Sequence, residues 1–206
     1  MPQENRSTDS PKKLPQIRSV ALIALGSNMP AATLDPREVI LSAVEGIAES
    51  CGVIRASSDC FATPAFPPGS GPDYVNAAVV LECDLSPVLL LDQLHAIEAQ
   101  HGRLRRARWA ARSLDLDLLA YDRQILPDLS VYESWQGMSL NEQRASAPDR
   151  LVLPHPRLQE RAFVLVPLLQ ALERAGLDWV HPVTGGRVPQ MLSALPAADI
   201  GAIKPL

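Results

Sequence analysis

The sequence of 206 residues has few cysteines, few aromatic residues and no long hydrophobic run. Its three cysteines form no C-x-x-C motif and cannot all pair, so we expect reduced thiols in place of a disulfide framework. The apolar runs are too short to cross a membrane, and the polar N-terminus has no apolar signal core. These absences predict a soluble, cytoplasmic protein without metal-binding cysteine pairs.

The chain also lacks an excess of positive charge. Its formal net charge is −4, which argues against a general nucleic-acid binder because such affinity depends on a broad cationic surface. Against this background, five arginines fall within ten residues, at Arg103, Arg105, Arg106, Arg108 and Arg112. This local cationic segment therefore indicates a specific anionic ligand.

The length fits one domain with room for a leader and an insertion. Residues 1–16 have no hydrophobic period, and we expect them to form a disordered leader before a domain over 17–206. The polar, weakly periodic segment 122–148 is predicted to be an insertion in that domain. The Pro- and Gly-rich segment 63–72 cannot form regular structure, and it is either a lid over a site or an inert surface loop.

The apolar pattern predicts the element order β-α-β-β-α-β. We expect strands over 18–25, 53–60, 74–82 and 114–118, and helices that begin at Asp35-Pro36 and Ser86-Pro87 and end before Gly52 and Gly102. This order is typical of an α+β, ferredoxin-like fold: an antiparallel sheet with both helices on one face and the last strand internal to the sheet. A short strand up to His155, an apolar helix near 164–172 and a terminal hairpin with a short helix are expected to follow.

Apolar and acidic residues alternate strictly from Leu114 to Leu118, which is the period of a half-buried strand. The leucines are predicted to face a core, while Asp115 and Asp117 project from the opposite face. Side chains two residues apart on a strand lie roughly 6.5–7 Å apart, so both carboxylates can hold one or two hard cations. An isolated D-x-D is more often only the solvated face of a strand, but the arginines upstream suit phosphate oxygens. The combination predicts chemistry on a metal–polyphosphate.

Several sequence blocks occur in the order typical of 6-hydroxymethyl-7,8-dihydropterin pyrophosphokinases, and the sequence resembles this family over roughly residues 18–195. The blocks are Gly26-Ser27-Asn28, Thr63-Pro64, Asp73-Tyr74-Val75-Asn76-Ala77-Ala78, Glu98 with Gly102-Arg103-Leu104-Arg105, Trp109, Arg112-Ser113-Leu114-Asp115-Leu116-Asp117, Pro154-His155-Pro156 and Arg161-Ala162-Phe163. Two departures stand out: His95 occupies a position where many relatives have glutamine, and the arginine segment is about one residue shorter than in some relatives.

The resemblance implies transfer of pyrophosphate from ATP to the hydroxymethyl group of the pterin, with release of AMP, in folate biosynthesis. It implies two Mg²⁺ ions held by Asp115 and Asp117, with Arg103 and Arg112 as further catalytic residues. The implied ATP-binding residues are Glu98, Arg103, Arg105, Trp109, Arg112, Leu118, Arg150, His155 and Arg161. The implied pterin-binding residues are Thr63, Pro64, Phe66, Tyr74, Asn76 and Phe163, with the two aromatic rings of Tyr74 and Phe163 as a stacking slot.

Two other readings of the same residues remain. Another two-metal, nucleotide-dependent transferase on this fold would use the aspartates and arginines but would not need the aromatic slot. A ferredoxin-like RNA-binding module would stack bases on its open sheet face, where this chain carries an acidic pair. We expect a monomer that binds ATP and a dihydropterin, and neither nucleic acid nor a membrane.

Overall fold

The computed structural model describes residues 18–65, 71–102, 113–139, 142 and 146–206. The first part of the chain forms β1 (Ser19–Ser27), α1 (Pro36–Ser50), β2 (Val53–Ser57), β3 (Phe61–Thr63), β4 (Tyr74–Cys83), α2 (Pro87–Gln100) and β5 (Asp115–Tyr121). The second part forms α3 (Leu129–Gly137), a 3-10 turn (Leu158–Glu160), α5 (Ala162–Ala175), α6 (Val188–Ser193), α7 (Ala197–Gly201) and β6 (Lys204–Pro205). This order confirms the predicted α+β class.

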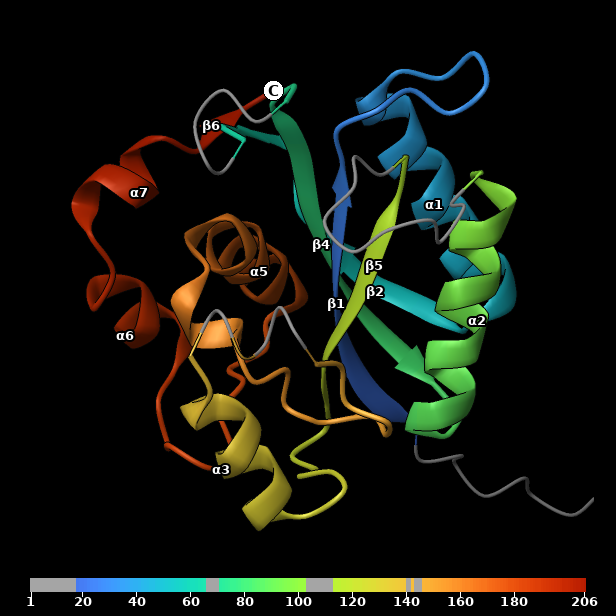
Figure 1. Cartoon of the computed structure of the whole chain (residues 1–206). Coiled ribbons are helices and arrows are strands. Elements are labelled where there is room, and N and C mark those ends of the chain that lie inside the picture. The colour runs from blue at the N-terminus through green and yellow to red at the C-terminus, as the bar shows by residue number, and fades with distance from the viewer. Residues whose placement is uncertain (1–17, 66–70, 103–112, 140–141, 143–145) are drawn as a thin grey trace, which may run out of the picture.

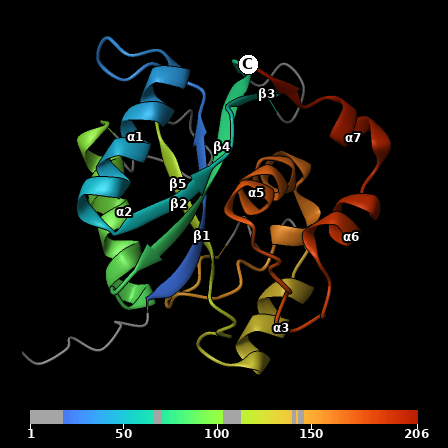
Figure 2. The same ribbon diagram turned by 180° about the vertical axis from the view of Figure 1, so that it is seen from behind.

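One antiparallel sheet runs through the middle of the molecule in the order β5-β1-β4-β3-β6, and β2 also pairs with β4 (Figure 1). Helices α1 and α2 lie on one side of it, while α5 lies on the other, with α6 and α7 beyond (Figure 2). The strands therefore carry a hydrophobic core on each face. Ile23, Leu25 and Leu116 belong to the core under α1 and α2, and Leu22 and Ala78 belong to the core under α5.

Both predicted helix starts are confirmed by their caps. The Asp35 side chain accepts from the Glu38 N–H and the Glu38 side chain accepts from the Asp35 N–H, which forms a capping box ahead of Pro36. The Ser86 hydroxyl accepts from the Leu89 N–H ahead of Pro87. Within the described part of the chain, no helix is long and apolar enough to cross a membrane.

The strand expected over 53–60 is shorter: β2 ends at Ser57, and a separate strand, β3, follows at Phe61–Thr63. The Ser58 hydroxyl accepts from the Ala78 N–H at 2.9 Å, and this side-chain bond interrupts the ladder between them. The expected terminal hairpin is reduced to a single bridge between Val180 and Arg187, because the residues after it form α6 and α7. The helix expected near 164–172 is longer, and spans α5 with Pro167 inside it.

The prediction that the D-x-D strand is internal to the sheet is wrong. Among the described residues, β1 is the strand that pairs with β5, so β5 forms an edge of the sheet. The physical reason is that no later segment that the structure describes supplies a strand beyond it. The segment up to His155 runs alongside β5 but donates only one backbone hydrogen bond to it, from the His155 N–H to the Leu119 carbonyl at 2.7 Å.

The predicted insertion contains helix α3, whose cap is Asp128. Tyr132 on this helix is fully buried, and its hydroxyl lies 3.1 Å from Nε2 of the fully buried His181. Trp179 packs its ring edge-on against the same imidazole. The insertion is thus attached to the C-terminal part of the chain by a buried polar and aromatic contact.

Candidate active site

The register of three neighbouring strands places the acidic pair and the predicted pterin-binding amide on one sheet face. Gly26 on β1 pairs with Asp115 on β5 and with Asn76 on β4. Residues directly opposite one another on neighbouring strands project to the same face. Ala24 pairs with Asp117 in the next such row. The predicted orientation is confirmed, because Leu116 and Leu118, which alternate with the two aspartates, lie in the core on the other face.

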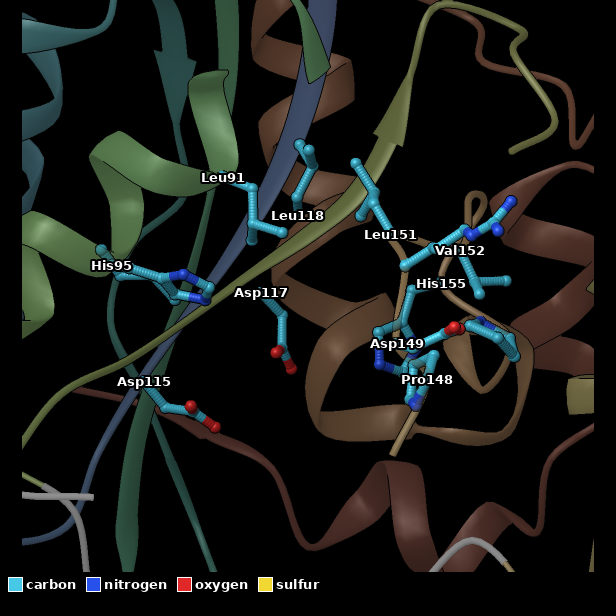
Figure 3. A pocket seen from close by; sticks show the side chains of 13 residues that line it. Leu91, His95, Asp115, Asp117, Leu118, Pro148, Asp149, Leu151, Val152 and His155 are labelled. Atoms are coloured by element: carbon cyan, nitrogen blue, oxygen red, sulfur yellow. The ribbon is translucent and has the colours of Figure 1, made fainter. Parts of the chain in front are cut away.

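A cavity of about 380 Å³ opens over this part of β5. Asp117 projects into it between His95 of α2 and the segment that carries Asp149 and His155 (Figure 3). Leu91, Leu118 and Leu151 contribute apolar walls. Such a lining can accept a ligand with two parts: a polyphosphate at the polar residues and an apolar base at the leucines.

Arg161 connects the acidic pair to a predicted pterin-binding ring. Its Nη1 lies 3.5 Å from Oδ2 of Asp117, and its guanidinium carbon lies 5.9 Å from the ring centroid of Phe163. Only 19% of the Arg161 side chain is exposed, and burial lowers its pKa while the neighbouring Asp117 opposes that shift. An arginine remains cationic under these conditions, so a fixed positive charge stands beside the candidate metal ligand.

His155 is held beside β5 as a neutral hydrogen-bond donor. Its Nδ1 accepts from the Arg157 N–H at 3.1 Å, so the ring proton of the neutral imidazole resides on Nε2. Burial, and then the charges of Arg161 and Arg157, lower the pKa of His155 to about 3. The histidine, which is one of the residues that line the cavity, therefore carries an N–H on Nε2 and no charge at neutral pH.

The predicted pterin-binding residues that the structure describes are not among the residues that line this cavity. Asn76 is buried and donates from Nδ2 to the Thr63 hydroxyl at 2.7 Å. A Cβ at Gly26 would lie 3.1 Å from Oδ1 of Asn76, so the missing side chain there leaves room for the amide. Tyr74 is half-buried at the start of β4, and Phe163 is exposed in the first turn of α5.

The Gly26-Ser27-Asn28 block connects separate segments around the site. The Ser27 hydroxyl donates to the Ser113 carbonyl at 2.6 Å, immediately before the acidic pair. The Asn28 side-chain amide donates to the Pro72 carbonyl at 3.4 Å, at the end of the Pro- and Gly-rich segment. These bonds explain why small polar residues stand at the end of β1 and directly after it.

Comparison with known proteins identifies the family. The model of the 7,8-dihydro-6-hydroxymethylpterin-pyrophosphokinase (HPPK) family matches residues 22–173. The chain belongs to this family. Relatives named 2-amino-4-hydroxy-6-hydroxymethyldihydropteridine pyrophosphokinase include one from Synechocystis sp., 34% identical over 198 residues, which cover 95% of this chain and 86% of the relative. Another from Pseudomonas aeruginosa is 36% identical over 181 residues, which cover 86% of this chain and 93% of the relative.

Solved structures agree with the HPPK fold. The wild-type HPPK-DHPS of Plasmodium falciparum superposes with a TM-score of 0.57 at 13% identity, over 86% of this chain and 44% of that chain. An HPPK-DHPS in complex with substrates gives a TM-score of 0.57 at 13% identity, over 86% of this chain and 43% of that chain. This chain thus spans less than half the length of these solved proteins, and at such identity the likeness concerns the fold alone.

The structure of this HPPK brings part of the predicted ATP site together in one cavity, namely Asp115, Asp117, Leu118, Arg150 and His155. Five predicted residues lie outside the described residues: Phe66, Arg103, Arg105, Trp109 and Arg112. The cavity also contains Leu91, Asp149, Leu151 and Val152, which were not predicted. Leu91 could have been found, because it stands four residues before His95 on the same helix face.

Among the described residues, no group of three or more His, Cys, Asp or Glu side chains could hold a metal ion by itself. Asp115 and Asp117 supply two oxygen ligands that both line the cavity. Mg²⁺ is usually bound by one or two carboxylates, with the remaining positions taken by substrate phosphates and water. The two aspartates therefore fit a magnesium–triphosphate better than a metal held by protein alone.

Proposed function

We propose that this HPPK transfers the pyrophosphoryl group of ATP to the hydroxymethyl oxygen of 6-hydroxymethyl-7,8-dihydropterin, giving the pterin diphosphate and AMP for folate biosynthesis. Family membership supports the reaction class. The observation that carries the assignment to particular residues is the shared face of Asp115, Asp117 and Asn76. It allows a metal–triphosphate and a heterocycle to lie side by side over the sheet.

At the ATP end, Asp115 and Asp117 would hold Mg²⁺, which we expect as two ions. A metal ion held there would supply positive charge next to the oxygens of the attacked β-phosphate and of the departing AMP. Arg161 stands 3.5 Å from Asp117 and would move its guanidinium to phosphate oxygens when the metal compensates that carboxylate. His155 would donate a hydrogen bond from its Nε2–H to a phosphate oxygen, and Arg150 lines the same cavity.

At the pterin end, Asn76 would recognise the amide-like edge of the heterocycle, since its side chain offers both a donor and an acceptor. The bond from its Nδ2 to Thr63 leaves Oδ1 and one amide proton for that contact. Tyr74 and Phe163 would stack on the two faces of the pterin, with Thr63 and Pro64 beside them. The other two-metal transferases considered above would not require this set.

The test is a coupled assay with ATP, Mg²⁺ and 6-hydroxymethyl-7,8-dihydropterin that follows AMP and the pterin diphosphate. Asp115→Ala and Asp117→Ala should lower turnover by orders of magnitude while the far-ultraviolet circular dichroism is unchanged. Asp178→Ala is the matched control, because Asp178 is an exposed partner of Arg187. Normal turnover in both aspartate variants would contradict the metal assignment.

A further inference from the structure

Because β5 is an edge strand, the backbone N–H groups on its outer side do not face a neighbouring strand among the described residues. The strand that carries both candidate metal ligands pairs with β1 on one side, and no strand among the described residues pairs with its other side. Backbone N–H groups on that outer side need another acceptor, since an unpaired buried N–H costs free energy comparable to a lost hydrogen bond. Leu116, between the two aspartates, is 2% exposed.

Glu98 supplies the acceptor. Its Oε1 accepts from the Leu116 N–H at 2.8 Å, and the residue is 1% exposed. It stands near the end of α2, whose Leu94 and Ile97 are buried in the same core. A carboxylate thus occupies the place where a neighbouring strand would present a carbonyl.

We propose that Glu98 is a positioning residue for the acidic pair: its carboxylate replaces the missing strand neighbour at Leu116 and so fixes the direction in which Asp115 and Asp117 present their oxygens. The inference rests on the proposed role of the aspartates as metal ligands and deepens it. Side chains that orient the ligands of a metal contribute to its binding, and their mutation typically lowers metal affinity or activity roughly 10–100-fold. Glu98 acts here through the backbone between the ligands, and its Oε1 is directed at the strand.

The geometry sets what each substitution should do. Gln at position 98 keeps an oxygen acceptor at the same reach, whereas Asp is shorter by one methylene and Ala has no acceptor. Glu98→Gln should therefore preserve the bond to Leu116, while Glu98→Asp and Glu98→Ala should lose it. Leu94→Ala is the matched control, because it removes buried contacts of the same helix without touching the Leu116 N–H.

The experiment measures affinity of the full chain for Mg²⁺ together with α,β-methylene-ATP by titration calorimetry, and hydrogen exchange at the Leu116 amide. We expect Glu98→Ala and Glu98→Asp to weaken the metal–nucleotide affinity roughly tenfold or more and to accelerate Leu116 exchange, with Glu98→Gln within about threefold of the wild type. Leu94→Ala should lower the melting temperature and leave the affinity of the folded protein unchanged.

Equal affinities in Glu98→Ala and the wild type, or equal loss in folded Glu98→Gln and Glu98→Asp, would overturn the proposal. If Glu98→Ala does not fold, the Gln and Asp variants decide by the same criteria. Asp115→Ala and Asp117→Ala separate this inference from the function on which it rests. Unchanged metal–nucleotide affinity in both would refute the metal assignment, whereas a loss there with none in Glu98→Asp would refute only the role of Glu98.

Discussion

Asp115 and Asn76 lie on opposite sides of Gly26 in one row across three strands, so a candidate metal ligand and a candidate pterin-binding residue project from the same face of the sheet. Neighbouring strands are about 4.8 Å apart, and the two Cα atoms are therefore separated by roughly 10 Å. A pyrophosphoryl group and a hydroxymethyl arm fit between them. The glycine in the middle of the row has no side chain to occupy that space.

Gly26→Ala should weaken pterin binding and leave ATP binding unchanged. The new Cβ would lie 3.1 Å from Oδ1 of Asn76, which is tighter than an ordinary contact, so the amide has to shift. Loss of about one hydrogen bond to the pterin corresponds to roughly a tenfold rise in its dissociation constant. Titration calorimetry with each substrate separately measures this difference.

Gly46→Ala is the control. Gly46 lies inside α1, and a Cβ there would be 3.6 Å from Ile97 of α2, which is an ordinary contact. It should increase the melting temperature slightly, since alanine favours a helix over glycine by about 1 kcal/mol. An unchanged pterin affinity in Gly26→Ala would contradict the placement of the pterin edge at Asn76.

Arg161→Lys should reduce kcat/KM for ATP roughly 10–100-fold, because an ammonium cannot reproduce the planar fork that grips phosphate oxygens or the stacking on Phe163. The positive charge next to Asp117 is retained, so the folded state should remain stable. Steady-state kinetics with varied ATP provides the measurement. Arg174→Lys, near the end of α5 where the arginine pairs with Asp59, should behave as the wild type, and equal kinetics in both variants would count against a phosphate role for Arg161.

His155→Gln should retain most activity, whereas His155→Ala should lose roughly 3–10-fold in kcat/KM for ATP, because only glutamine can place an N–H near the position of Nε2. The pKa of His155 is lowered to about 3, so the imidazole is neutral throughout the range from about pH 5 to 8. The ratio of kcat/KM between the wild type and His155→Gln should therefore stay constant across that range. A ratio that changes with one ionisation near pH 6 would show that His155 titrates during activity.

Local pattern was sufficient to predict the face of β5 and the starts of α1 and α2. Alternation from Leu114 to Leu118 depends only on neighbours in sequence, as do the caps at Asp35 and Ser86. The Pro-His-Pro segment was also placed at the site, by resemblance to the family.

Longer-range features could not be predicted. Whether β5 has one neighbour or two depends on where distant segments pack, and the bond between Glu98 and Leu116 exists only because β5 is an edge. The contact between Tyr132 and His181 joins residues 49 apart in the sequence, and no local signal marks either as a partner of the other.

His181 should make the protein sensitive to acid. Its Nδ1 accepts from the N–H groups of Val183 and Thr184, at 3.2 and 3.3 Å, so protonation of that nitrogen breaks both bonds. Burial lowers the pKa of His181 to about 4, from an ordinary value of 6.5. Because the unfolded chain takes up the proton first, this stability is fully present above about pH 6.5 and is lost as the pH falls towards 4.

The loss should amount to roughly 3 kcal/mol, measured by urea unfolding at pH 7 and near pH 4. Other carboxylates also titrate in this window, so the informative quantity is the difference between the wild type and His181→Asn. Asparagine cannot be protonated there but can still accept from the two N–H groups. Tyr132→Phe, which removes the hydroxyl next to Nε2, should lower the free energy of unfolding by about 1 kcal/mol at pH 7 and keep the wild-type pH dependence. If the wild type and His181→Asn lost the same stability between these pH values, His181 would not be the group responsible.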